Sequence, residues 1–332
     1  MAKIIIGKNL QQKLRELTKN RTAVIITDDN MEKIYLEKFF PLSDASLVYS
    51  IPPGEQSKNR KMKEKIEDFM LEHKVPKNSV IIALGGGVVT DLAGFVASTY
   101  KRGISYINVP TTLLGMVDAS IGGKTGIDTE HGKNLIGAIW QPEAILMDMD
   151  FLATLPEDEI SNGMAEAIKT AVIGDRKFFD FLERADVKNK DDLTKIIKKC
   201  SELKSKIVKK DLRDKGIRNL LNFGHTIGHA IEKCSNYKLK HGYCVSIGMA
   251  VESQLARNME LLNETEFERI INLLKKYNLP TKLPKMDIKC LLDSIKNDKK
   301  MENNEIKMIL IKKIGKPRSV KLSLQLIKKV LE

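Results

Sequence analysis

The sequence predicts an α/β domain followed by a mostly α-helical domain. Its 332 residues accommodate two domains of roughly 150 residues each. The first half alternates short runs of β-branched residues with amphipathic segments, a pattern typical of a parallel sheet covered by helices on both faces. Beyond about residue 155, long lysine-rich segments have helical periodicity instead. We therefore expect an α/β domain over residues 1–154 and a helical domain over residues 155–332, with the junction near Asp148–Pro156.

Uninterrupted runs of apolar and β-branched residues mark three expected strands, at residues 23–27, 79–84 and 104–109. An amphipathic segment at residues 60–73 is an expected helix between the first two strands. Five segments of the second half have helical spacing, at residues 160–173, 193–210, 222–234, 246–262 and 266–277.

The composition, with 42% hydrophobic and 30% charged residues, is that of a soluble globular protein. The net charge of +13 allows two interpretations: a surface that binds nucleic acid, or a solvated surface with a pocket for an anionic metabolite. Arginine supplies only 11 of the 56 basic residues, and aromatic residues make up 5%. Because base readout and stacking rely on these residues, the composition favours the metabolite.

The four cysteines, Cys200, Cys234, Cys244 and Cys290, lie far apart without a Cys-x-x-Cys spacing. This pattern argues against a disulfide framework and against a cysteine zinc cluster. The apolar run near the first residue is too short for a signal peptide, and no stretch is apolar enough to span a membrane. We therefore expect a reducing, cytoplasmic setting with no membrane partner.

Three glycines, Gly85, Gly86 and Gly87, lie between an expected strand and a helical segment. Glycines at this point let the backbone approach a pyrophosphate, which the helix amides then bind. A tight turn uses the same residues, so both interpretations stay open. Asp28 and Asn30 follow another strand at the same edge, either as ligand-binding groups or as a turn or N-cap.

The segment Pro110–Gly126 is rich in small and hydroxyl residues. It is predicted to be a loop, because it is too flexible for a good helix and too polar for a core. It contains Asp118 and Lys124, and Lys133 and Asn134 follow it. The functional interpretation is a loop that places Lys124, Lys133 and Asn134 around an anion, and the alternative is an ordinary surface loop.

Three of the five histidines, His225, His229 and His241, lie close together in the sequence. On a helix, His225 and His229 share one face through their i, i+4 spacing. Glu166, among small and apolar residues, offers a carboxylate. A catalytic divalent metal typically takes three protein ligands and keeps one position open. These four residues are therefore candidate ligands, and the spacing does not decide which two histidines bind.

Arg218, Asn222, His225 and His229 follow the spacing i, i+4, i+7, i+11 and would share one stripe of a continuous helix. A stripe with a cation, an amide and two imidazoles is unsuited to a core. We expect it to face a ligand, with a solvated helix face as the alternative.

These motifs resemble the 3-dehydroquinate synthase family of sugar phosphate cyclases. The blocks that carry the resemblance are residues 85–94, 108–124, 133–134, 162–169 and 218–229, followed by His241. Shorter matches extend it over nearly the whole chain, at residues 27–30, 53–58 and 298–300. The resemblance implies a Rossmann-like NAD-binding domain followed by a helical metal- and substrate-binding domain.

The resemblance also implies a cytoplasmic homodimeric lyase that depends on NAD and Zn²⁺, with Co²⁺ as an alternative ion. Its substrate is 3-deoxy-D-arabino-heptulosonate 7-phosphate, and its products are 3-dehydroquinate and phosphate, on the shikimate pathway to chorismate and the aromatic amino acids. The family reaction combines transient oxidation by NAD, phosphate elimination, re-reduction, ring opening and intramolecular aldol closure. The expected partner is a small anionic sugar-acid phosphate, not nucleic acid.

By the same resemblance, Glu166, His225 and His241 are the metal ligands, and His229 contacts the substrate. The other residues matched to the substrate are Asp118, Lys124, Asn134, Lys169, Lys204, Arg218, Asn222, one of Lys299 and Lys300, and Arg102, which would reach the phosphate pocket of a neighbouring subunit. Those matched to the cofactor site are Asp28, Asn30, Glu55, Lys58, Gly85, Gly86, Gly87, Asp91, Thr111, Thr112, Asp118, Lys124, Lys133, Asn134 and Thr154.

Two positions depart from the family pattern. Asp214 stands where many relatives carry Glu, and residues 303–304 stand where a glycine is common, although residues 306–310 keep a strand-like alternation. The rival functions are another sugar phosphate cyclase such as 2-deoxy-scyllo-inosose synthase, a polyol dehydrogenase of the same fold, and a basic nucleic-acid-binding protein. Lys204 and Arg218 favour an acidic substrate, because cations buried without an anion are costly.

Overall fold

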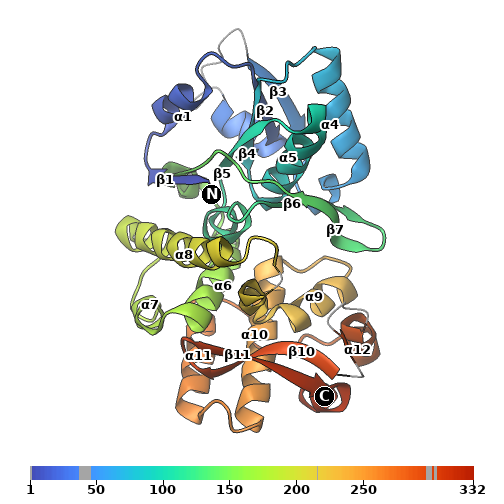
Figure 1. The fold of residues 1–332 in the computed structure, drawn as a ribbon. Coiled ribbons are helices and arrows are strands. Elements are labelled where there is room, and N and C mark those ends of the chain that lie inside the picture. Colours follow the sequence, from blue (N-terminus) through green and yellow to red (C-terminus); the bar gives the residue numbers. More distant parts are fainter. Residues whose placement is uncertain (1, 37–45, 215, 297–300, 303–304) are drawn as a thin grey trace. The chain divides into compact units, whose positions relative to one another are not determined.

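The computed structural model describes residues 2–36, 46–214, 216–296, 301–302 and 305–332 (Figure 1). The chain divides into two compact units, Met1–Pro156 and Glu157–Glu332. The boundary expected from the sequence was after residue 154.

The first unit is built on a six-stranded parallel sheet in the order β1-β8-β5-β4-β2-β3. Its strands are β1 (Lys3–Gly7), β2 (Ala23–Asp28), β3 (Ser46–Ile51), β4 (Val80–Gly85), β5 (Ser105–Pro110) and β8 (Ala144–Asp148). β4 is buried along its whole length, as its continuous apolar run predicts for an internal strand. The three strands expected from the sequence are confirmed to within one residue at each end.

Helices and short turns connect these strands. They are α1 (Gln11–Thr18), α2 (Asp29–Met31), η1 (Glu32–Leu36), η2 (Glu55–Ser57), α4 (Arg60–Glu72), α5 (Gly87–Thr99), η3 (Tyr100–Arg102), η4 (Gly115–Ala119) and η5 (Met149–Thr154). Asn59 caps α4 by accepting the backbone N–H of Met62 at 2.9 Å. The apolar face of α4 buries Ile66 and Met70 in the same core cluster as Leu92 of α5. The helix expected at residues 60–73 is thus confirmed.

The segment Pro110–Gly126 is not the loop that the sequence predicted. Its middle forms the helical turn η4, and its end begins β6 (Lys124–Thr129), which pairs antiparallel with β7 (Gly132–Ile139). Leu113 and Val117 are fully buried. The segment therefore contributes to the core, and the small residues between its apolar side chains concealed that pattern.

The second unit is mostly helical, as expected. Its helices and turns are α6 (Glu157–Gly174), α7 (Arg176–Leu182), α8 (Lys190–Lys210), η6 (Ile217–Asn222), α9 (His225–Cys234), α10 (His241–Asn258), α11 (Glu264–Lys276), α12 (Ile288–Lys296) and α13 (Leu324–Leu331). An antiparallel sheet in the order β11-β10-β9 completes the unit, with strands β9 (Met301–Glu302), β10 (Glu305–Lys313) and β11 (Lys316–Ser323). The alternation noted at residues 306–310 belongs to β10.

The helix expected to begin at Asn222 begins instead at His225, as α9. Gly224, just before it, has a φ of +78° and donates its backbone N–H to Glu252 Oε2 at 2.6 Å. Glycine adopts this left-handed conformation without the steric cost that a Cβ brings. Arg218 and Asn222 therefore lie on η6, and the predicted continuous stripe with α9 was wrong.

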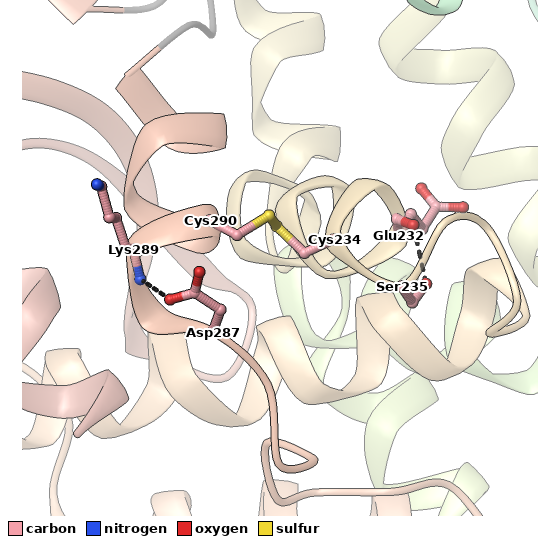
Figure 2. Close-up of a disulfide and its surroundings, with 6 residues drawn as sticks. All are labelled: Glu232, Cys234, Ser235, Asp287, Lys289 and Cys290. Atoms are coloured by element: carbon pink, nitrogen blue, oxygen red, sulfur yellow. Dashed lines mark hydrogen bonds between the residues drawn. A yellow bond between two sulfur atoms is a disulfide. The ribbon is translucent and has the colours of Figure 1, made fainter.

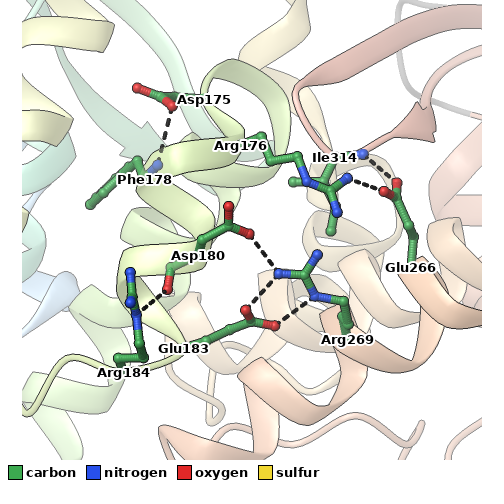
Figure 3. A network of polar contacts seen from close by, with 9 residues as sticks. All are labelled: Asp175, Arg176, Phe178, Asp180, Glu183, Arg184, Glu266, Arg269 and Ile314. Atoms are coloured by element: carbon green, nitrogen blue, oxygen red, sulfur yellow. Dashed lines mark hydrogen bonds and ion pairs between the residues drawn. The ribbon is translucent and has the colours of Figure 1, made fainter.

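Charged side chains connect α11 to α7 and to the turn between β10 and β11 (Figure 3). Arg269 on α11 donates to Asp180 and to Glu183, in each case at 2.6 Å. Glu266, buried on the same helix, accepts the backbone N–H of Ile314 at 2.7 Å. Because partly exposed ion pairs contribute only about 0–1 kcal/mol each, this network mainly orients the elements it joins.

Cys234 and Cys290 form a disulfide between α9 and α12, with their Cα atoms 6.1 Å apart (Figure 2). The expectation of no disulfide was wrong. A pairing across 56 residues depends on the tertiary approach of two helices, which spacing in the sequence does not reveal. Cys200 and Cys244 are buried and are not part of a disulfide. The disulfide therefore anchors the C-terminal end of α9.

Loss of this disulfide is expected to lower the stability of the protein. Closing a loop of this length stabilises the folded state by about 4 kcal/mol in the chain-entropy model. We expect a reductant, or Cys234→Ser combined with Cys290→Ser, to lower the free energy of unfolding in urea by about 2–4 kcal/mol. The double variant is the control: a further loss when reductant is added to it would contradict the role given to this bond.

Candidate active site

Glycines and threonines meet at the carboxyl ends of β4 and β5. Gly86 precedes α5, whose first turn has no side-chain cap. The Thr111 backbone N–H donates to the Gly85 carbonyl at 3.0 Å, and a Cβ on Gly86 would lie 3.1 Å from the methyl group of Thr112. A helix N-terminus bordered by small residues is suited to a phosphate group. The structure thus places Gly85, Gly86, Gly87, Thr111 and Thr112 close together.

Asp28, at the end of β2, is the N-cap of α2. Its Oδ1 accepts the backbone N–H groups of Asn30 and Met31 at 3.0 and 3.1 Å. Burial raises the pKa of Asp28, and the two hydrogen bonds counteract part of the rise. The capping interpretation of Asp28 is therefore confirmed, and Asn30 lies exposed beside it.

Lys58 is the centre of a polar cluster in the first unit, which we call the Lys58 cluster. Its Nζ lies 2.5 Å from Asp91 Oδ2 and 2.6 Å from Asn134 Oδ1, and the residue is only 4% exposed. Burial opposes the charge of Lys58, but Asp91 and Glu55 outweigh it and raise the pKa of the amine. Lys133 Nζ lies 3.5 Å from Glu55 Oε1. The structure therefore gathers these five predicted residues.

Asp128 joins the Lys58 cluster, and the sequence interpretation missed it. Its backbone N–H donates to the Lys58 carbonyl at 2.7 Å, and its Oδ1 accepts the Asn134 N–H at 2.9 Å. Burial raises its pKa to about 6, against the opposing effect of Lys58. A predicted β6–β7 hairpin would have placed Asp128 close to Asn134. We expected a loop up to Gly126 instead, and therefore did not predict the hairpin.

The other residues predicted in the first unit lie on short turns and strand ends. Asp118 is half-buried on η4, Lys124 is exposed at the start of β6, and Arg102 is exposed at the end of η3. The Thr154 hydroxyl is hydrogen bonded to the Tyr35 hydroxyl at 2.7 Å. Arg102 is accessible, as a contact to a neighbouring subunit requires, and its role stays a prediction.

Glu166, His225 and His241 come together from three helices of the second unit. Glu166 on α6 is fully buried, and its Oε1 lies 3.5 Å from His225 Nε2 and 3.4 Å from His241 Nε2. Lys169, one turn along α6, contacts the other carboxylate oxygen. The three ligand atoms lie within 4.8 Å of one another. Atoms bound to one tetrahedral zinc ion at about 2.1 Å are about 3.4 Å apart, so these residues fit a divalent cation.

The protonation states of His225 and Glu166 also suit a cation. Burial, reinforced by the charge of Lys169, holds the pKa of His225 well below its usual value. The neutral ring has Nδ1 at 3.1 Å from the Phe223 carbonyl, and a proton donated there leaves the Nε2 lone pair facing Glu166. Burial opposes ionisation of Glu166, but Lys169 and His241 outweigh it and lower the pKa of the carboxyl.

His241 also faces a second carboxylate. Its Nδ1 lies 3.4 Å from Oε1 of Glu232, and the group His229, Glu232 and His241 likewise has ligand atoms within 4.8 Å. Burial opposes charge on His241, but Glu166 and Glu232 raise its pKa to about 10. The exposed ring of His229 has its centroid 5.2 Å from that of His225. The three histidines are therefore neighbours, as their clustering in the sequence predicted.

Direct backbone contacts between helices bring the ligands together. A Cβ on Gly242, next to His241 on α10, would lie 2.1 Å from the Asn162 carbonyl oxygen of α6. The Gly242 N–H donates to Asn162 Oδ1 at 2.7 Å. A Cβ on Gly248 would lie 1.9 Å from the carbonyl oxygen of Gly224, the residue before α9. α10 therefore approaches both α6 and α9 where a larger residue would force the helices apart.

Three predicted cations of the second unit are buried. Lys169, Lys204 and Arg218 are 1%, 6% and 3% exposed, and they lie on α6, α8 and η6. Arg218 Nη1 donates to the Leu212 carbonyl at 3.3 Å. Lys169 is already paired with the Glu166 carboxylate.

The remaining residues of this unit that the sequence singled out are Asn222, Asp214, Lys299 and Lys300. Asn222 lines a cavity of about 130 Å³ together with residues of α9, β10 and β11. Asp214 is half-buried and has a φ of +55°. Lys299 and Lys300 lie outside the described residues.

The fold and the site together define a class of protein. A parallel sheet that ends at a glycine-lined helix N-terminus is typical of dinucleotide-binding enzymes. Two histidines and a buried carboxylate are a typical ligand set of a catalytic zinc ion. These are features of a metal- and nucleotide-dependent α/β enzyme.

The chain belongs to the 3-dehydroquinate synthase family. The family model 3-dehydroquinate synthase N-terminal matches residues 48–162, and the model 3-dehydroquinate synthase C-terminal matches residues 163–301. The resemblance seen in the sequence is thereby confirmed. Among the helices that the structure describes, none has the length and apolar character needed to cross a membrane.

Solved structures of several enzymes are similar to the whole chain. The 2-epi-5-epi-valiolone synthase from Streptomyces hygroscopicus subsp. jinggangensis 5008, with NAD+ and Zn²⁺ bound, is 27% identical with a TM-score of 0.91, over 100% of this chain and 96% of that chain. A 2-deoxy-scyllo-inosose synthase, complexed with carbaglucose-6-phosphate, NAD+ and Co²⁺, is 25% identical with a TM-score of 0.89, over 99% and 95% of the two chains. These matches confirm the predicted fold class.

The close approach of α10 to Gly224 predicts that Gly248→Ala destabilises the protein. The added methyl group must push the two helices apart, and overpacking of this kind costs about 1–3 kcal/mol. We expect this loss in the free energy of unfolding measured in urea. Gly174→Ala is the matched control, because its Cβ would make ordinary contacts with Leu203 at 3.7 Å. Equal stabilities of the two variants would refute the argument.

Proposed function

We propose that this protein is a 3-dehydroquinate synthase, a carbon–oxygen lyase that converts 3-deoxy-D-arabino-heptulosonate 7-phosphate to 3-dehydroquinate and phosphate. The observation that carries the proposal is the burial of Lys204 and Arg218 in the unit that also holds Glu166, His225 and His241. A carboxylate and a phosphate on one substrate offer anions to such cations. The match of both family models supports the same activity.

The first unit, in this proposal, binds NAD. The amides at the start of α5 receive the pyrophosphate beside Gly85–Gly87. The Lys58 cluster contributes the charged groups that the family resemblance assigns to the cofactor. NAD supplies transient oxidation of the substrate and is regenerated in each turnover. The NAD+ in the two solved relatives supports this assignment.

The second unit, in the same proposal, holds a divalent metal through Glu166, His225 and His241. A metal ion there supplies Lewis acidity to the substrate hydroxyl groups. Lys169 holds one oxygen of Glu166, so that the other faces the two histidines. The Zn²⁺ and Co²⁺ in the relatives support a zinc site that also accepts cobalt.

The chain's own side chains then bind and orient the substrate. Lys204 and Arg218 neutralise its anionic groups, and charge-assisted hydrogen bonds fix their direction. His229, exposed next to His225, contacts the substrate beside the metal group. Holding a flexible molecule in one orientation removes much of the entropic cost of a ring closure. We also propose a homodimer on the shikimate pathway, with Arg102 completing the neighbouring subunit's phosphate site.

The second candidate is another sugar phosphate cyclase. The relatives at 27% and 25% identity are a valiolone synthase and a deoxy-scyllo-inosose synthase, and the latter was solved with a carba-sugar phosphate. A sugar phosphate without a carboxylate has one anionic group fewer. The burial of both Lys204 and Arg218 therefore favours the acid substrate.

A substrate comparison tests the proposed activity. With NAD and Zn²⁺, we expect the heptulosonate phosphate to release inorganic phosphate without net NADH, because the cofactor is reoxidised in each cycle. Glucose 6-phosphate should release none. Phosphate release from glucose 6-phosphate alone would establish the other cyclase activity, and NADH accumulation without phosphate release would establish a dehydrogenase.

Removal of a metal ligand tests the metal centre. His225→Ala is expected to lower the affinity for Zn²⁺ more than about 100-fold and to abolish phosphate release, because two ligands bind far more weakly than three. Metal content after dialysis is measured by mass spectrometry. His73→Ala, on the exposed end of α4, is the control and should keep both metal and activity. Full metal content in His225→Ala would contradict the ligand assignment.

A further inference from the structure

Glu232 is a buried carboxylate that the proposed function does not use. It lies on α9, two turns after His225, and is only 3% exposed. Its Oε1 faces Nδ1 of His241 at 3.4 Å. A charged group is costly to bury, so its place next to this ring calls for a role.

The two ring nitrogens of His241 face two different carboxylates. Nε2 lies 3.4 Å from Glu166, and Nδ1 lies 3.4 Å from Glu232. A neutral imidazole carries one N–H and one lone pair. A metal ion on the Glu166 side displaces the Nε2 proton, and the ring then keeps its Nδ1 proton and donates it to Glu232.

We propose that Glu232 is a positioning residue that orients the His241 ring and selects the tautomer that binds a divalent cation together with Glu166 and His225. This inference rests on the metal site of the proposed function. His225 uses the backbone carbonyl of Phe223 for the same purpose, at 3.1 Å from its Nδ1. His225 and His241 thus each have an acceptor at Nδ1, on the opposite side of the ring from Glu166.

The charges around the site give Glu232 a second effect. Lys169 contacts Glu166 and offsets its negative charge. Glu232 therefore adds a second negative charge near the place of a bound dication. Its anionic partner also makes the His241 ring a stronger electron donor to the cation.

A different arrangement of the same residues makes a contrasting prediction. His229, Glu232 and His241 are also close enough to hold an ion, with Glu232 as a direct ligand. That arrangement requires His229, which is exposed, and it leaves the fully buried Glu166 with Lys169 as its counter-ion and no metal ion to bind. In the arrangement we propose, His229 is dispensable for metal binding.

The test measures metal affinity without substrate, by competition of the full-length protein with a chromophoric chelator for Co²⁺. Glu232→Ala is expected to bind Co²⁺ about 10–100-fold more weakly and with an altered Co²⁺ absorption spectrum. Glu232→Gln should recover much of the affinity, since its amide oxygen still accepts the Nδ1 proton. Ser235→Ala is the local control, because its hydroxyl bonds the backbone carbonyl of Glu232 and not the carboxylate (Figure 2).

Three outcomes decide the inference. Wild-type affinity in Glu232→Ala would overturn it. Equal losses in His229→Ala and Glu232→Ala would overturn it in favour of Glu232 as a direct ligand. Weak binding in Glu232→Ala, recovery in Glu232→Gln and full affinity in His229→Ala would support it. Because His225→Ala tests the metal site itself, its result separates a failure of this inference from a failure of the proposed function.

Discussion

The arrangement of Glu166, His225 and His241 depends on the backbone contacts of α10 with α6 and with the start of α9. These three residues come from three helices, and their ligand atoms must lie within a few ångströms of one another. Helices packed through ordinary side chains have axes about 8–10 Å apart. Gly242 and Gly248 have no side chain at the two contact points, so α10 brings His241 close to both neighbours.

The charges of the second unit are arranged around the same helices. Glu166 is fully buried, yet Lys169 on the next turn of α6 holds one of its oxygens. A residue three positions along a helix lies above its partner, so α6 alone fixes this pair. The free oxygen of Glu166 must then face α9 and α10. Local helix geometry thus decides which atom is available to a ligand, before any ligand binds.

The features predicted correctly from the sequence are those with local causes. The strands of the first unit follow from continuous apolar runs, and the histidine cluster follows from composition and spacing. The features predicted wrongly depend on distant partners. The break at Gly224 involves Glu252, the Cys234–Cys290 bond spans 56 residues, and the β6–β7 hairpin depends on pairing that small residues concealed. Glu232 escaped notice because its partner, His241, lies beyond a turn.

The two relatives indicate that side chains, and not the shared backbone, determine which substrate is bound. Two enzymes with different names share this backbone with TM-scores of 0.91 and 0.89, although only 27% and 25% of the residues are identical. A scaffold this similar fixes the cofactor and metal groups but does not discriminate between sugar phosphates. Discrimination must come from side chains that gain or lose a partner with each substrate. In the function we propose, Lys204 and Arg218 are the candidates, because both are buried cations in the unit that holds Glu166, His225 and His241.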